Sequence, residues 1–158
     1  MINKYEKLQD VVKGKRIRFL ELRTALPLKG VYTRGTSHVP WIVIGADQTT
    51  DEKTCACAEA LGHHETSSGN ILEYQPYARE RALYRAKKWA YETLLPLDAI
   101  GASYILCDAN PFGMADHLGV SPQFLDASIA YYERRYGESF RTEQFEFLFL
   151  PFFSVISI

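Results

Sequence analysis

The 158-residue sequence predicts a single α+β domain in which helices pack on a small antiparallel sheet. Segments with apolar residues at helical spacing alternate along the chain with short segments rich in β-branched and aromatic residues. No internal repeat or linker separates them, and hydrophobic residues make up 47% of the chain, which is enough for a substantial core. We therefore expect one domain over residues 1–158.

The first part of this domain should be a helix followed by three strands. Residues 1–14 carry apolar side chains at helical spacing and end in Gly14, a good helix terminator. Residues 15–46 then contain three short apolar segments separated by turn residues. We expect the segments RIRFLEL, KGVYT and HVPWIVIG to form a small meander.

Two longer helices are expected over residues 49–97. The first should begin at Thr49, because Glu52 three residues later completes a capping-box pattern, and should run to about Glu65. The second covers the stretch that ends at Pro96 and has an apolar period of 3.6 residues. Its predicted buried stripe consists of Leu83, Ala86, Ala90 and Leu94.

The last part should contain a helix-turn-helix-like pair and then strands. Ser121 and Pro122 form a good N-cap and first helical position, so residues 110–137 should divide into two helices. Residues 140–158 alternate at first and then become almost wholly apolar, which predicts one or two strands. This apolar end must be buried by the domain or by a partner, and a homodimer is one arrangement that would bury it.

Charge and composition narrow the function classes. The 18 basic and 19 acidic side chains give a net charge of -1, so the chain as a whole has no electrostatic attraction for nucleic acid or for a membrane. No N-terminal signal-like segment and no apolar run of about 20 residues is present, which makes the cytoplasm the expected location. Cys55, Cys57 and Cys107 are odd in number and lack C-x-x-C spacing, so reduced thiols are expected.

Residues 55–69, CACAEALGHHETSSG, place two metal-type side chains one helical turn apart. Glu59 and His63 can both reach one ion from one helix face, as in H-E-x-x-H metal helices, and both are legitimate zinc ligands. Ala60 stands where a hydrolase needs its general base, and alanine accepts no proton. The alternative is an ordinary i, i+4 pair on a partly exposed helix.

The order of two motifs resembles the ImmA/IrrE family of metallopeptidase-like proteins, in the branch found in prophages and mobile elements. The motifs are CACAEALGHHETSSGNI at residues 55–71 and RAKKWAYETLLPL at residues 85–97, and the resemblance extends over most of the chain. It implies zincin-like helices and a role in regulating gene transfer or phage induction, since active relatives cleave a repressor.

Within this resemblance, Glu59 and His63 take two metal-ligand positions, Ala60 takes the position of the general base, and Leu83 takes that of the third ligand. Glu80, one turn before Leu83, is the candidate replacement ligand. A positioned base contributes about 10²- to 10⁴-fold in rate, so peptidase activity should be impaired without one. Because Leu83 cannot bind metal at the position of the third ligand, zinc is not assured either. We expect a pseudoenzyme that binds a protein, and the alternative is an active zinc peptidase with a rearranged site.

The predicted helix pair near the C-terminus could bind either DNA or a protein. Ala115 and Gly119 are the small residues that let two helices of a helix-turn-helix pack closely. The second helix would offer Gln123, Asp126 and Ser128 to a DNA groove, but its positive charges come only at the far end, so DNA contact is not favoured. The resemblance implies a protein partner, such as a phage-type repressor, and closing the core is the structural alternative.

Overall fold

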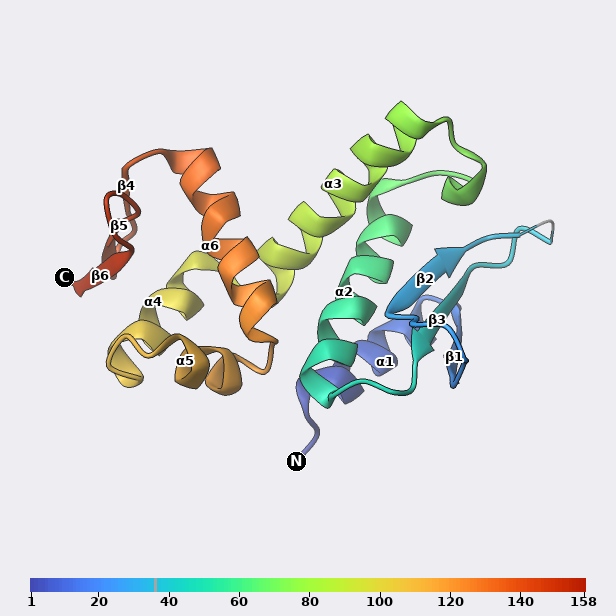
Figure 1. Cartoon of the computed structure of the whole chain (residues 1–158), viewed down its shortest axis with the longest axis horizontal. Coiled ribbons are helices and arrows are strands. Elements are labelled where there is room, and N and C mark those ends of the chain that lie inside the picture. Colours follow the sequence, from blue (N-terminus) through green and yellow to red (C-terminus); the bar gives the residue numbers. More distant parts are fainter. Residues whose placement is uncertain (36) are drawn as a thin grey trace. The chain divides into compact units, whose positions relative to one another are not determined.

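The computed structural model describes residues 1–35 and 37–158, and it confirms the α+β class (Figure 1). In this part of the chain, six α-helices accompany two sheets of three strands each. Contacts divide the chain into two compact units, Met1–Ala90 and Tyr91–Ile158. The expectation of one domain therefore stays a prediction. None of the helices in the described ranges has both the length and the apolar content needed to cross a membrane.

The first unit contains a three-stranded sheet and the helices that pack on it. Its elements, in chain order, are α1 (Lys4–Gly14), β1 (Arg18–Leu22), β2 (Gly30–Thr33), β3 (Trp41–Gly45), α2 (Thr50–Thr66), the short 3-10 helix η1 (Ile71–Glu73) and most of α3 (Pro76–Leu94). The predicted start of α2 is confirmed, because the side chain of Thr49 accepts a 3.1 Å hydrogen bond from the backbone nitrogen of Glu52.

The predicted meander and the predicted antiparallel sheet are wrong. The strand order is β1-β3-β2, with β1 parallel to β3 and β2 antiparallel to β3, so the sheet is mixed. The most apolar strand takes the centre, where Ile42 and Ile44 are fully buried, whereas the edge strand β1 exposes Leu20 and Leu22. Burial along β3 alternates, with Ile42 and Ile44 buried and Trp41 and Val43 half-buried, so one face of the central strand is packed more tightly than the other.

Helix α2 packs against α1, β2 and β3, so it is enclosed on several sides. Small side chains make this close packing feasible. At Gly30 of β2, for example, an added Cβ would lie 3.2 Å from the Cβ of Ala56. The buried residues of α2 are Thr54, Cys55, Cys57, Ala58, Ala60, Leu61 and Gly62.

The second unit begins with the last turn of α3 and continues through three helices and three strands. The helices are α4 (Leu97–Leu106), α5 (Pro111–Leu118) and α6 (Pro122–Tyr136), and the strands are β4 (Ser139–Arg141), β5 (Phe145–Leu148) and β6 (Ser154–Ser157). The strands form an antiparallel sheet in the order β4-β5-β6, so three strands replace the one or two expected.

The predicted helix pair over residues 110–137 is confirmed as α5 and α6. Gly119, between them, has φ 71°, a left-handed conformation that favours glycine, and Ser121 caps α6 by accepting a hydrogen bond from the backbone nitrogen of Phe124. One detail of the expected groove face is wrong. Ser128 is fully buried and donates a hydrogen bond to the carbonyl oxygen of Phe124, because it faces the core side of α6.

Helix α4 was not expected from the sequence. Its segment, LDAIGASYIL, is apolar on nearly every side and contains a glycine, so it shows no amphipathic period. An added Cβ at Gly101 would lie 2.7 Å from Cδ2 of Phe145, which shows that the sheet lies directly on this part of the helix. Tertiary packing, rather than local pattern, therefore selects the helix.

The apolar C-terminal segment is partly buried within its own unit. Along β5 and beyond, exposure alternates: Phe145, Phe147 and Phe149 are buried, whereas Leu148 and Leu150 are exposed. The buried face covers α4, and the other face stays open in this unit. Burial of that open face in a homodimer stays a prediction.

Candidate functional site

The motif helix α2 approaches α3 most closely at the glycine of its ELGH-like motif. An added Cβ at Gly62 would lie 2.3 Å from the carbonyl oxygen of Ala86, and this neighbour is backbone that cannot swing aside. Only glycine allows the two helices to come this close. The motif glycine therefore has a packing role in the chain, and it brings the two predicted motif helices together.

Glu59 is half-buried on α2, beside this crossing point. Burial raises the pKa of its carboxyl group, and the positive charges of Lys87 on α3 and of Lys29 act in the opposite direction. The carboxylate therefore has cationic side chains near it. Electrostatically, these lysines supply some of the positive charge that a metal ion would bring.

His63, one turn after Glu59, is also half-buried, and its imidazole stacks on Tyr32 with ring centroids 6.5 Å apart and an interplanar angle of 7°. Burial lowers its pKa, which favours the neutral ring that a metal ligand needs. Its Nδ1 atom is buried and has no hydrogen-bond partner in the described part of the chain. This nitrogen is therefore a buried polar atom whose hydrogen-bonding capacity is unused.

His64 is held by a hydrogen-bond chain on the sheet side of α2. The Nε of Arg34 donates to the hydroxyl of Tyr32 over 3.0 Å, and that hydroxyl lies 2.8 Å from Nδ1 of His64. Because the hydroxyl already accepts from Arg34, its own proton is available for Nδ1. Burial and the Arg34 charge both lower the pKa of His64. His64 is therefore a positioned structural group.

The two apolar positions of the motif differ in their surroundings. Ala60 is 3% exposed, so the residue at the predicted general-base position is buried. Leu83 is 41% exposed, and its predicted place in the buried stripe is wrong. Ala82 takes that place, since the close approach at Ala86 admits only small side chains on this face of α3.

Glu80 lies on the exposed first half of α3, where it lines a shallow surface hollow with Arg81, Tyr84 and Arg85. Across residues 1–35 and 37–158, no three His, Cys, Asp or Glu side chains lie close enough together to hold a metal ion. Burial raises the pKa of the Cys57 thiol to about 12, so that sulfur stays protonated at neutral pH. A catalytic zinc site uses three protein ligands and a water, and this donor set does not fit one.

No protein-family model matches the chain, and no curated protein matches it. The resemblance to the ImmA/IrrE family therefore stays a prediction that rests on the sequence motifs. The helix crossing at Gly62 and the Glu59–His63 pair are the structural features that bear on it.

The two units differ in net charge, although the chain as a whole is almost neutral. Residues 1–90 contain 15 Lys and Arg and 10 Asp and Glu, whereas residues 91–158 contain 3 Lys and Arg and 9 Asp and Glu. Counting charged residues separately before and after residue 90 would have revealed this difference from the sequence alone. The first unit is therefore basic and the second is acidic.

Proposed function

We propose that this chain is a prophage or mobile-element protein of the ImmA/IrrE type that has lost peptidase activity and acts by binding a protein partner. The observation that supports the proposal is the donor set around α2. Glu59 and His63 stand one turn apart, Ala60 is buried at the position of the base, and Leu83 is exposed at the position of the third ligand. Among the described residues, no three His, Cys, Asp or Glu side chains lie close enough together to hold a metal ion, which supports the proposal.

The packing supports retention of the scaffold. Gly62 forms the close contact with Ala86 of α3, a packing role that depends on both motif helices. Lys87 and Lys29 lie near the Glu59 carboxyl group, so that group has cationic neighbours without a metal ion. A family member that does not bind metal can therefore keep the crossing of α2 and α3 and the lysines near Glu59.

Metal content is the first test. The untagged protein, purified without added zinc, should contain far less than one equivalent by elemental mass spectrometry, and the His63→Ala variant should give the same value. Near-stoichiometric zinc that is lost in the variant would contradict the proposal. It would favour an active zinc peptidase with a rearranged site, for which the unpartnered Nδ1 of His63 is the supporting observation.

Partner binding is the second test. The repressor of the same mobile element should be retained by the immobilised protein in the presence of a chelator, and it should remain intact when zinc is supplied. Binding that disappears with the chelator would contradict a metal-independent role. A gel shift at moderate salt should show no DNA complex. The exposed residues of α6 that were expected to face a DNA groove include Gln123 and Asp126 but no lysine or arginine.

A further inference from the structure

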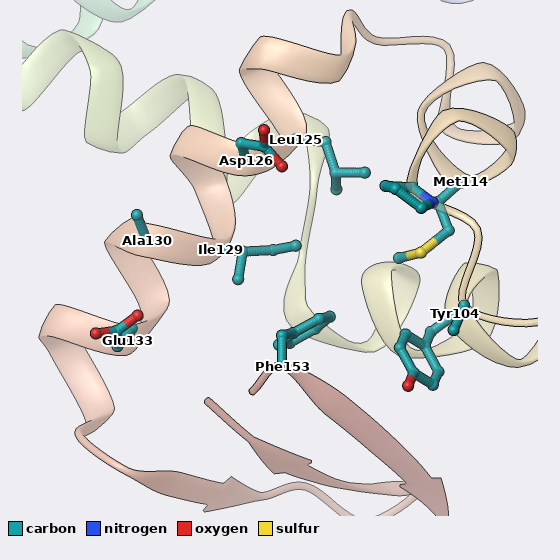
Figure 2. Close-up of a pocket in the computed structure, with 10 residues that line it drawn as sticks. Tyr104, Met114, Leu125, Asp126, Ile129, Ala130, Glu133 and Phe153 are labelled. Atoms are coloured by element: carbon teal, nitrogen blue, oxygen red, sulfur yellow. The ribbon is translucent and has the colours of Figure 1, made fainter. Parts of the chain in front are cut away.

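A hollow of about 430 Å³ lies within the second unit, between α6, the α4–α5 turn and the segment before β6 (Figure 2). This volume is within the range of about 300–1,000 Å³ that is typical of ligand sites. Figure 2 shows that Leu125 and Ile129 extend from α6 toward Met114, so these three side chains form an apolar floor. None of these residues belongs to the motif described above.

One wall of the hollow is aromatic and held in place by its neighbours. The rings of Tyr104 and Phe153 meet edge to face, with centroids 5.7 Å apart and an interplanar angle of 89°. Phe153 also packs on the buried Phe149, at a centroid distance of 5.8 Å. Aromatic faces of this kind attract apolar groups and cations alike, and the fixed rings reduce the entropy lost on binding.

The rim of the hollow is acidic. Asp126 and Glu133, both on α6, are lining residues, and no Lys, Arg or His side chain lines the hollow. Neither carboxylate takes part in an ion pair with another described residue of the chain. Seven residues of helix separate their backbones by about 10 Å along the axis, so a single ammonium group does not match both positions. Two basic groups that flank an apolar group match the positions of both carboxylates.

We propose that this hollow binds a peptide segment of a protein partner in which an apolar side chain stands between two arginine or lysine side chains. The apolar side chain would enter between Ile129 and Phe153, and the basic side chains would pair with Asp126 and Glu133. The net negative charge of residues 91–158 attracts such a segment over a longer range. The inference rests on the proposed protein-binding function and names the chemistry of the surface that performs it.

Peptide binding measured by fluorescence polarisation tests the site directly. The probe is a fluorescein-labelled ten-residue peptide with leucine between two arginines, and the matched peptide has glutamates in place of the arginines. The arginine peptide should bind more tightly, with an affinity that falls as salt increases, and amide NMR shifts should change around Ala130 and Phe153. Equal binding of the two peptides, or shift changes confined to other surfaces, would overturn the inference.

A matched pair of charge variants completes the experiment. The Asp126→Asn/Glu133→Gln protein should bind the arginine peptide about three- to tenfold more weakly, as expected for two partly exposed ion pairs. The Glu143→Gln/Glu146→Gln protein loses the same charge at exposed positions outside the hollow, and it should bind like the wild type. Equal affinities in the two variants would overturn the inference.

The same variants separate this inference from the proposed function. Repressor binding that is weakened by Asp126→Asn/Glu133→Gln and kept by Glu143→Gln/Glu146→Gln supports both. Repressor binding that is unchanged in both variants overturns the hollow as the binding surface, while the proposed function stands. Absence of repressor binding by the wild type contradicts the proposed function, whereas selective binding of the arginine peptide would still support the hollow.

Discussion

The motif region of α2 and the hollow on α6 differ in how tightly their polar side chains are surrounded by packed neighbours. Around Glu59 and His63, α2 buries Ala58, Ala60 and Gly62, so the polar groups are enclosed by packing. The hollow in the second unit has no recognisable motif, yet it combines an apolar floor with two carboxylates that form no ion pair with another described residue. The comparison shows that Gly62 of the α2 segment has a packing role, whereas the exposed Asp126 lies in the other unit.

The largest expected effect is on the helix crossing in the first unit. Gly62→Ala should lower the free energy of unfolding by about 3 kcal/mol, because its Cβ meets the backbone of Ala86 and a helix must move. Urea denaturation measures this change. Gly14→Ala is the matched control, since an added Cβ there meets nothing within 4 Å.

The corresponding glycine of the second unit sharpens this comparison. Gly101→Ala should cost less, about 1–2 kcal/mol, since its Cβ meets the Phe145 ring, which can shift more easily than backbone. A cost for Gly62→Ala no greater than that of Gly101→Ala would mean that the α2–α3 crossing is not rigid.

Removing one hydroxyl group from each unit should have an intermediate effect. Tyr32→Phe loses the 2.8 Å contact with His64 and the bond from Arg34, and Tyr132→Phe loses the 2.8 Å bond to the carbonyl oxygen of Leu95. Each should lower the free energy of unfolding by about 1–1.5 kcal/mol in urea denaturation. A neutral Tyr32→Phe would show that the chain from Arg34 to His64 adds nothing to stability.

Acidification should weaken the first unit. Burial lowers the pKa of His63 and of His64 in the folded state, so the unfolded chain binds protons more readily. Stability should therefore fall as the pH decreases through about 6.5, the ordinary pKa of histidine, and should stop falling below the native-state pKa values. Urea midpoints between pH 8 and pH 5 measure this trend.

The double variant His63→Gln/His64→Gln should lose much of the pH dependence in that window, whereas the exposed His117→Gln should keep it. Equal slopes in the two variants would contradict a role for the motif histidines in acid sensitivity.

The smallest effect should come from the exposed ion pairs. Lys15 pairs with Glu65 in the first unit, and Arg135 pairs with Glu92 in the second. Glu65→Gln and Glu92→Gln should each change the free energy of unfolding by less than about 1 kcal/mol, since solvent screens both pairs. A larger loss for Glu92→Gln would indicate that its shared contact with Tyr131 and Arg135 acts as a network.

The local signals in the sequence were sufficient for most helices and for the starts of α2 and α6. Thr49 and Ser121 cap α2 and α6 as predicted, because a cap depends on residues within three positions of each other. The Glu59–His63 spacing was also readable, since residues four apart share a helix face.

The same local signals could not provide the order of the strands, the existence of α4 or the exposure of Leu83. Strand order depends on pairing between segments far apart in the chain, such as β1 with β3, and α4 depends on contact with the sheet at Gly101. The phase of α3 is decided by the close approach of α2 at Ala86, which favours alanine over leucine on the buried side. These are contacts between residues far apart in the chain.

The sequence by itself determined the α+β class, the helix caps and the two candidate ligands on one turn of α2, because each follows from spacing along the chain. Only the tertiary structure decided that no third donor joins Glu59 and His63 in the described residues, and that an acidic-rimmed hollow forms around Ile129. The physical reason is that convergence of side chains is a property of how helices pack, and packing here is set by backbone contacts at positions such as Gly62.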